Sequence, residues 1–198
     1  MKTNGCTSKL WLSILGKDDR VRVFARKCKI INVPLDQKRK FFDEYHIQEN
    51  GPGSISIGLE YNNNLVACMT FIVQPNGVMN LNRYATACQV VGGFSKLLKH
   101  FQSHYEWNEI LSFADLRWSE GNMYNQNGFT LDKILPPDYE YVDLTSMQRI
   151  HKFNFRHKNL PKMLGKLYNP SWSETQNTYN AGWYKIYNCG LLRYVVNK

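Results

Sequence analysis

The sequence predicts a mixed α/β fold of the α+β type, in which a mostly antiparallel sheet is flanked by helices. Three consecutive segments with alternating apolar residues, separated by turn residues, are typical of an antiparallel meander. A glycine turn at Gly92-Gly93 then leads into an amphipathic helical pattern. The chain has 198 residues, of which 43% are hydrophobic, so it is long and apolar enough to form a core.

The first half of the chain is expected to supply a strand, a helix and the meander. Pro34 ends the strand, and Asp36 is the expected N-cap of the helix, which carries Phe41, Phe42 and Tyr45 on one face. The expected elements are a strand at 21–33, a helix from 36 to about 47, and strands at 55–61, 65–73 and 78–87.

The second half is expected to alternate helices and strands within the same α/β unit. Its first helix places Phe94, Leu97, Leu98 and Phe101 at the i, i+3, i+4, i+7 spacing of one helical face. Gly128 ends a shorter second helix. The elements expected after the first helix are a strand at 110–115, a helix at 119–127, a strand at 129–135, a hairpin of 139–144 and 149–155, a basic helical stretch beyond 156 and a terminal strand at 183–196.

The net charge of +9 is unevenly distributed along the chain. Residues 1–35 carry +6, residues 36–143 carry −5 and residues 144–198 carry +8. Basic ends around an acidic middle predict a polyanionic partner. Nucleic acid fits best, and double-stranded DNA is favoured, because Lys and Arg contacts with phosphate dominate such binding. A solvated basic face without a partner stays open as the alternative.

Three segments follow from the element order and the charge. They are an N-terminal arm at 1–20, a core domain at 21–156 and a basic C-terminal extension at 157–198 that packs on the core. The residues expected to contact DNA are basic or aromatic: Arg26, Lys27, Arg117, Trp118, Arg149, Lys152, Arg156, Lys158 and Lys162.

Several classes of protein are excluded by composition. No apolar run approaches the roughly 20 residues that a membrane helix needs, so no membrane partner is expected, and the N-terminus lacks the long apolar centre of a signal peptide. The five cysteines are scattered without CxxC spacing, which predicts reduced thiols in the cytoplasm and neither a disulfide framework nor a zinc ribbon. His100 and His104 have a metal-binding spacing but no acidic or Cys partner, so no metal site is expected.

Five residues after the meander form a spaced motif: Gln89, Gly92, Tyr124, Gly128 and Phe129. This motif resembles that of the GNAT N-acyltransferase superfamily. The resemblance implies a GNAT-like acyltransferase fold, a loop that holds the pyrophosphate of acetyl-CoA or another acyl-CoA, and Tyr124 as general acid. The cofactor-binding residues that it implies are Gln89, Val91, Gly92, Gly93, Ser95, Lys96 and Asn122.

Phe94 departs from that motif, because it stands where the superfamily has a small residue. A ring at this position predicts crowding of the pyrophosphate. The same feature favours a binding module without catalytic activity.

A closer resemblance covers nearly the whole chain from Val21 onward. It rests on blocks at 25–28, 45–48, 58–59, 90–98, 112–119 and 188–190 and on the pair Tyr139 and Tyr141. These blocks resemble a bacteriophage family related to Mom, the GNAT-like phage protein that modifies adenine in DNA to evade restriction. The family also occurs as the C-terminal part of phage homing-endonuclease-like proteins. The resemblance implies an anti-restriction role in the cytoplasm of a bacterial host.

Four residues are candidates for catalysis, each with a structural alternative. Asp115 ends a strand and can orient a base amine or accept its proton, or else pair with Arg117. Tyr124 can donate a proton or pack in the core. Arg83 can meet a phosphate or carboxylate or form a strand-end salt bridge, and His46 can act as a base near neutral pH or simply pack.

The leading hypothesis is therefore a phage DNA-binding protein of GNAT fold that modifies DNA bases in the manner of Mom. The alternative is a non-catalytic DNA-binding module derived from a homing-endonuclease C-terminal domain, or a binder of a host protein. A nuclease is disfavoured, because the sequence contains neither a GIY-YIG motif nor an HNH set.

Overall fold

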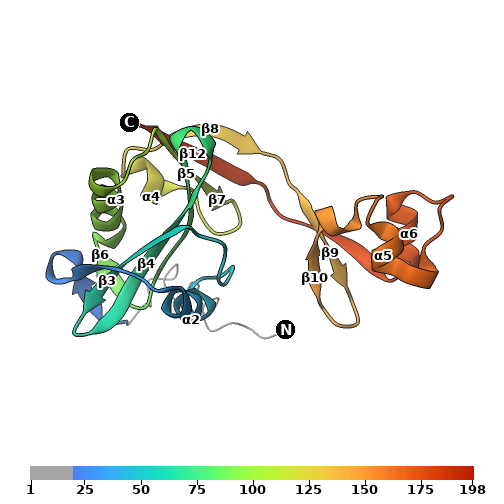
Figure 1. The fold of residues 1–198 in the computed structure, drawn as a ribbon, viewed down its shortest axis with the longest axis horizontal. Coiled ribbons are helices and arrows are strands. Elements are labelled where there is room, and N and C mark those ends of the chain that lie inside the picture. Colours follow the sequence, from blue (N-terminus) through green and yellow to red (C-terminus); the bar gives the residue numbers. More distant parts are fainter. Residues whose placement is uncertain (1–19) are drawn as a thin grey trace. The chain divides into compact units, whose positions relative to one another are not determined.

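The structure is a computed structural model that describes residues 20–198 (Figure 1). The predicted N-terminal arm, apart from Arg20, lies outside these residues. The chain divides into two compact units, which we describe separately. The sheet unit comprises residues 20–113, 121–133 and 193–198, and the inserted unit comprises residues 114–120 and 134–192.

A seven-stranded sheet organises the sheet unit, in the order β2-β3-β4-β5-β7-β12-β8. Its strands are β2 (Lys29–Asn32), β3 (Ile55–Tyr61), β4 (Asn64–Val73), β5 (Val78–Thr86), β7 (Glu109–Asp115), β8 (Thr130–Leu135) and β12 (Leu191–Asn197). The predicted meander is confirmed, because β3, β4 and β5 pair antiparallel in sequence order. The pair of β5 with β7 is parallel.

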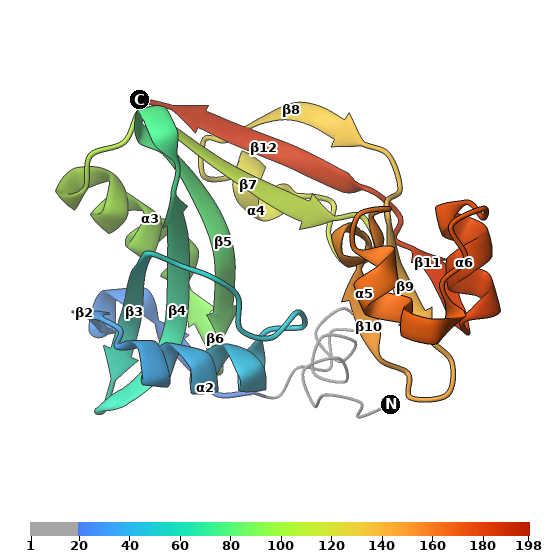
Figure 2. The same cartoon turned by 45° about the vertical axis from the view of Figure 1, so that its right-hand side comes forward.

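Two helices cover opposite faces of this sheet: α2 (Leu35–Tyr45) and α3 (Gly93–His104) (Figure 2). Phe42 of α2 packs in a buried cluster with Cys68 of β4, whereas Phe101 of α3 stacks on Phe71 of the same strand at 3.6 Å between ring centroids. Cys68 and Phe71 are an odd number of residues apart, so they point to opposite faces. Both helices were predicted from their apolar faces.

The N-terminal strand differs from the prediction. The expected strand at 21–33 is broken into β1 (Arg22–Phe24), the 3₁₀ turn η1 (Ala25–Lys27) and β2. β1 pairs in parallel with β6 (Gln89–Val91), a short strand that the sequence did not predict. The expected cap of α2 at Asp36 is also wrong, because Pro34 stands at the N-cap. Asp36 lies inside the first turn, where its negative charge interacts favourably with the positive end of the helix dipole.

The inserted unit is built around a three-stranded sheet in the order β10-β9-β11. Its elements are β9 (Tyr139–Asp143), β10 (Arg149–His151), η3 (Lys152–Phe155), α5 (Leu160–Leu164), η4 (Gly165–Leu167), α6 (Glu174–Asn180) and β11 (Trp183–Tyr187). The predicted hairpin is confirmed as the antiparallel pair of β9 and β10. Its second strand was expected to reach residue 155, but it ends at His151 and the next four residues form η3. A separate core holds the unit together, with Tyr141, Phe155, Leu160 and Leu164 buried against one another.

The C-terminal part of the chain departs from the predicted domain boundary after residue 156. Residues 134–192 form one unit, and Arg193–Lys198 belong to the sheet unit. The expected terminal strand at 183–196 is two strands, β11 and β12, which separate at Gly190. Gly190 has a φ of 92°, and a Cβ there would lie 2.5 Å from the carbonyl oxygen of Leu135, so only glycine fits this break. The short helix expected at 119–127 is limited to α4 (Asn122–Asn125).

Candidate functional site

β5 and β7 pair over only three residues each before the ladder ends. Val78–Asn80 pair with Glu109–Leu111, and no further pair of these two strands follows in the described chain. The next residues of the two strands are Leu81 and Ser112. They are joined by a side-chain hydrogen bond, in which the Ser112 hydroxyl donates to the carbonyl oxygen of Leu81 at 2.8 Å. The Tyr124 hydroxyl lies 2.9 Å from the same Ser112 oxygen. The point where the strands part therefore carries two buried hydroxyl groups in contact.

Aromatic rings surround Tyr124. Its ring centroid lies 5.0 Å from that of Tyr194, 5.5 Å from that of Phe129 and 5.9 Å from that of Phe94. Phe94 in turn meets Tyr84 edge-on at 5.2 Å. Burial raises the pKa of Tyr124, although the hydrogen bond with Ser112 acts in the opposite direction. The hydroxyl is therefore fully protonated at neutral pH.

The expectation that Phe94 crowds the pyrophosphate loop is wrong. Its side chain is 5% exposed and points inward from α3, between the rings of Tyr84 and Tyr124. The pocket at the loop is lined by other residues. The ring fills the apolar core beneath the turn and leaves the solvent side of the turn open.

The turn between β6 and α3 has the backbone of an anion-binding site. Gly92 is left-handed, with a φ of 75°, and the nearest atom to a Cβ there would be that of Ala25 at 3.9 Å. Gly93 lies close to the core, because a Cβ would come within 2.8 Å of the Tyr84 hydroxyl. The first hydrogen bond of α3 runs from the Lys96 N–H to the carbonyl of Gly92 at 3.0 Å. The N–H groups of residues 93–95 come before it and lie at the positive end of the helix dipole.

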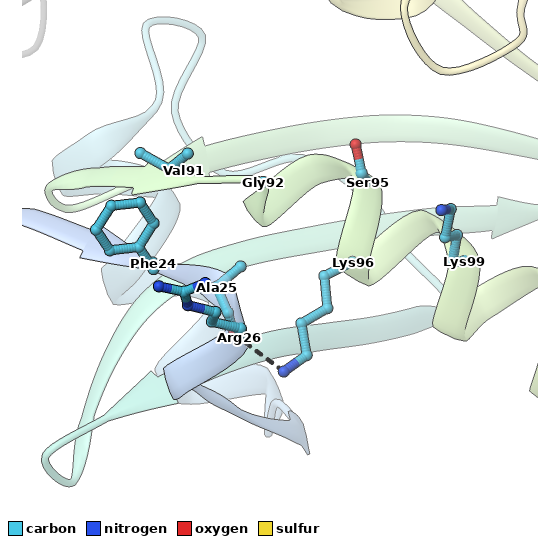
Figure 3. A pocket seen from close by; sticks show the side chains of 8 residues that line it. All are labelled: Phe24, Ala25, Arg26, Val91, Gly92, Ser95, Lys96 and Lys99. Carbon is cyan, nitrogen blue, oxygen red and sulfur yellow. Dashed lines mark hydrogen bonds between the residues drawn. The ribbon is translucent and has the colours of Figure 1, made fainter.

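A pocket of about 640 Å³ adjoins this helix end (Figure 3). It is lined by residues of η1 and its flank, of β6 and of the first two turns of α3: Phe24, Ala25, Arg26, Val91, Gly92, Ser95, Lys96 and Lys99. Three of these are cations, and the first turn of α3 contains no acid. The pocket is thus suited to an anion.

Two of the lining residues fix the walls of the pocket. Lys96 Nζ donates to the carbonyl oxygens of Ala25 at 3.0 Å and Cys28 at 2.7 Å, which ties η1 to α3 (Figure 3). The Ser95 hydroxyl donates to Asn127 Oδ1 just after α4, and Asn127 Nδ2 donates to the carbonyl of Met123 at 2.7 Å. These hydrogen bonds hold Lys96 and Ser95, and with them η1 and the start of α3, in place without a ligand.

Most of the predicted cofactor residues gather at this turn. Val91, Gly92, Ser95 and Lys96 line the pocket, and Gly93 lies directly beneath it. Gln89 lies in β6 and Asn122 is exposed at the start of α4, and neither lines the pocket. The residues that the sequence did not assign to this site are Phe24, Ala25, Arg26 and Lys99. Arg26 was expected to contact DNA instead.

Arg83 and His46 lie near each other on the other face of the sheet. Tyr84 contacts Phe94 on the α3 side of the sheet. Successive side chains of a strand point to opposite faces, so the side chain of Arg83 points to the face that α2 covers. Its Nε donates to the carbonyl of Glu49 at 3.3 Å. Burial, and then the charge of Arg83, lower the pKa of His46 to about 4. His46 is therefore neutral and weakly basic at pH 7, and this pair does not share a face with Tyr124.

Asp115 forms the ion pair that the sequence left open. Arg117 approaches it with Nε at 3.0 Å from Oδ1 and Nη2 at 2.6 Å from Oδ2. Burial alone would raise the pKa of Asp115, but the hydrogen bonds and charge of Arg117 outweigh it and hold that pKa below its ordinary value. Asp115 is thus a weaker base than a free carboxylate, and both residues belong to the inserted unit.

The remaining residues expected to contact DNA are divided between the units. Arg26 and Lys27 lie in η1 of the sheet unit. The inserted unit contains the others: Arg117, Trp118, Arg149, Lys152, Arg156, Lys158 and Lys162. Within residues 20–198 no group of His, Cys, Asp and Glu side chains is suited to hold a metal ion. No helix in the same part of the chain is long and apolar enough to cross a membrane.

Comparison with solved structures identifies the fold. An acetyltransferase from Bacillus subtilis in complex with CoA is similar, with 12% identity and a TM-score of 0.51, over 87% of this chain and 99% of that one. The ribosomal-protein-S18-alanine N-acetyltransferase from Escherichia coli has 10% identity and a TM-score of 0.50, over 86% of this chain and 93% of that one. A GNAT family acetyltransferase from Elizabethkingia anophelis with acetyl-CoA bound has 13% identity and a TM-score of 0.47, over 87% and 99% of the two chains.

These similarities confirm the predicted GNAT-like fold. At such low identity they concern the fold alone. No protein-family model matches the sequence, and no curated protein does either.

Proposed function

We propose that the sheet unit binds an acyl-CoA through its phosphates at the turn between β6 and α3 and acts as a GNAT-type acyltransferase. The observation that carries this proposal is the pocket at the positive end of α3, which Arg26, Lys96 and Lys99 line and which has no acid in the first helical turn. A protein of similar fold, the Bacillus subtilis acetyltransferase, was solved in complex with CoA.

The residues at the turn fit a diphosphate. The backbone N–H groups of Gly93, Phe94 and Ser95 lie in the first turn of α3, before the hydrogen bond from Lys96 to Gly92. A helix has no internal acceptor for these first N–H groups, so they can donate to phosphate oxygens. Open space above Gly92 lets a ligand approach the backbone closely. Lys96 is held on two carbonyl oxygens and positions η1, which leaves Arg26 and Lys99 as the exposed cations for a phosphate.

Acyl-CoA, when bound, supplies an acyl group activated as a thioester. Tyr124 keeps its proton at neutral pH because burial raises its pKa, and it is the proton donor at its hydroxyl oxygen. Ser112 Oγ lies 2.9 Å from that oxygen and, because its own hydrogen goes to the carbonyl of Leu81, it accepts from Tyr124 and orients the Tyr124 hydroxyl. The rings around Tyr124 exclude water from this hydroxyl pair.

The acceptor that we propose is a base in DNA, in the manner of the phage Mom-related family. The sequence blocks that resemble that family and the +8 charge of residues 144–198 support this assignment. Trp118 and Asp115, both in the inserted unit, are the candidates to stack on the base and to orient its amine. A role in anti-restriction within a bacterial host follows from the same resemblance.

A non-catalytic DNA-binding module is the second candidate. It is favoured by the packing around Tyr124, which is 7% exposed and touches three other rings. Mass spectrometry of nucleosides from cells that express the chain separates the two. A modified base supports the enzyme, and ordinary bases alone support the module.

Isothermal titration calorimetry with acetyl-CoA tests the cofactor site itself. Replacing the two exposed cations, as Arg26→Gln with Lys99→Gln, is expected to weaken binding about tenfold. The control is Arg39→Gln with Lys40→Gln, which removes two exposed cations of α2 outside the pocket and is expected to leave the affinity unchanged. Absence of binding heat for the unaltered protein at millimolar acetyl-CoA overturns the proposal.

A further inference from the structure

One end of the three-stranded sheet in the inserted unit carries aromatic rings and cations in contact with one another. We call this the cation–aromatic row, and it consists of Tyr187, Tyr139, Lys152, Phe153 and Arg156. The Tyr187 and Tyr139 ring centroids are 5.5 Å apart, and Lys152 Nζ lies 5.3 Å from the Tyr139 centroid and 5.9 Å from that of Phe153. The Arg156 guanidinium lies 4.0 Å from the Phe153 centroid. Each cation thus lies within cation–π range of a ring.

Two of the three rings in the row are open to solvent although the unit has a complete core. Phe153 is 52% exposed and Tyr187 is 58% exposed, whereas Tyr141 and Phe155 are fully buried. The exposed half of such a ring adds no stability to the fold, because only the area removed from water is stabilising. The exposed rings therefore have surface available for a partner.

The charge around the row favours an anion. Between residues 144 and 173 the sequence has six cationic Lys and Arg residues and no acid. The acids near the row are engaged: Asp138 pairs with Lys152, Asp143 accepts from Ser146, and Glu174 accepts from the Tyr141 hydroxyl. Glu140 is exposed, and it is the remaining acid of β9. None of the described acids pairs with Arg149, Arg156, Lys158, Lys162 or Lys166.

We propose that the cation–aromatic row binds unpaired nucleotides of a single-stranded nucleic acid. The rings offer flat faces on which bases stack, and the Arg156 guanidinium, which no described acid pairs with, lies beside Phe153 to meet a phosphate. Phosphates alternate with the bases along a strand, as cations and rings do at Phe153 and Arg156. In a duplex the base faces are stacked on one another, so exposed rings have nothing to contact there. This inference deepens the DNA part of the proposed function and does not depend on acyl-CoA binding.

Fluorescence anisotropy with the full chain tests the proposal. The probes are a labelled (dT)12, the same length of duplex DNA and (rU)12, all at one salt concentration. We expect (dT)12 and (rU)12 to bind at least about tenfold more tightly than the duplex, because stacking of each base on an aromatic side chain is worth roughly five- to 150-fold.

Two variants separate stacking from general charge attraction. Phe153→Leu keeps an apolar side chain but removes the ring, and it is expected to weaken (dT)12 binding about tenfold. Tyr179→Leu is the matched control: this tyrosine is 61% exposed in α6 of the same unit but lies outside the row, so the affinity is expected to stay within about twofold. Arg156→Gln is expected to lower the salt dependence of log K by about 0.7, the value for one phosphate contact on a single strand.

The outcomes that overturn the proposal are specific. Equal or tighter binding of the duplex contradicts it, as does an unchanged affinity of Phe153→Leu. Displacement of (dT)12 by inorganic polyphosphate at equal phosphate concentration means that only charge is recognised, which also contradicts it. Acetyl-CoA calorimetry on the same samples distinguishes this failure from failure of the proposed cofactor site.

Discussion

The two units use aromatic residues in opposite ways. In the sheet unit Phe94 and Tyr124 are 5% and 7% exposed, and their neighbours are other rings. In the inserted unit Phe153 and Tyr187 are more than half exposed, and cations lie over Phe153. Rings packed on rings build a water-free environment for a hydroxyl group, whereas rings beside cations are suited to a ligand that is both flat and anionic.

The largest expected difference between the units is in stability. Phe94→Ala removes a buried ring between Tyr84 and Tyr124, and we expect it to lower the free energy of unfolding by about 3–5 kcal/mol. The matched change Phe153→Ala removes a ring that is 52% exposed and contacts only surface cations, and it is expected to cost about 1 kcal/mol. Urea denaturation measures both, and equal losses would contradict the contrast between a packed and an open set of rings.

Gly121→Ala is expected to cost about 3 kcal/mol within the sheet unit. Gly121 has a φ of 80°, and a Cβ there would lie 2.1 Å from the hydroxyl oxygen of the buried Tyr194, which stacks on Tyr124. Gly128→Ala is the control, since its φ is 82° but no atom lies within 4 Å of the added carbon. Thermal unfolding of the two variants should differ accordingly, and the idea fails if Gly128→Ala is as damaging.

The pH dependence of stability tests the buried position of His46. Its pKa is lowered to about 4 from an ordinary value of 6.5, so on acidification the unfolded chain takes up this proton first. This residue therefore contributes a loss of stability as pH falls from 6.5 to 4, of about 3 kcal/mol in total. His46→Gln should remove that component of the pH profile, whereas the exposed His104→Gln should retain it. A wild-type profile that is flat over this range would show His46 to be solvated.

The smallest expected effect lies in the core of the inserted unit. The Tyr141 hydroxyl donates to Glu174 Oε1 at 2.7 Å, so Tyr141→Phe is expected to cost about 1 kcal/mol. Acetyl-CoA binding should not change, because the pocket residues belong to the sheet unit. Calorimetry and urea denaturation of the same sample check both statements, and a loss of acetyl-CoA affinity would show that the two sites are coupled.

Local patterns predicted the parts of the fold that local contacts determine. The meander and the apolar face of α3 follow from periods of two and 3.6 residues, and both are present. β6 was missed because it has three residues and exists through its pairing with β1, which is distant in sequence. α6 was missed as well, although Ser173 and Gln176 form a capping box that signals its start.

The candidate site was predicted where the chain is continuous and missed where it is assembled from distant segments. Val91, Gly92, Ser95 and Lys96 follow from one motif. Arg26 reaches the same pocket through the parallel pair of β1 and β6, which no local pattern indicates. The helical period placed Phe94 correctly on the apolar face of α3, where its ring is buried. The crowding of the loop was wrong because it was inferred from the motif position alone, without regard to the direction of the side chain.

The separation of the two binding sites is tested most directly by a crossed titration. Arg26→Gln with Lys99→Gln and the single variant Phe153→Leu are each titrated with acetyl-CoA and with (dT)12. We predict that the pocket variant loses affinity about tenfold for acetyl-CoA alone, and that the row variant loses affinity about tenfold for the oligonucleotide alone. Loss of both ligands in either variant, or no binding of acetyl-CoA by the unaltered chain, would contradict the account.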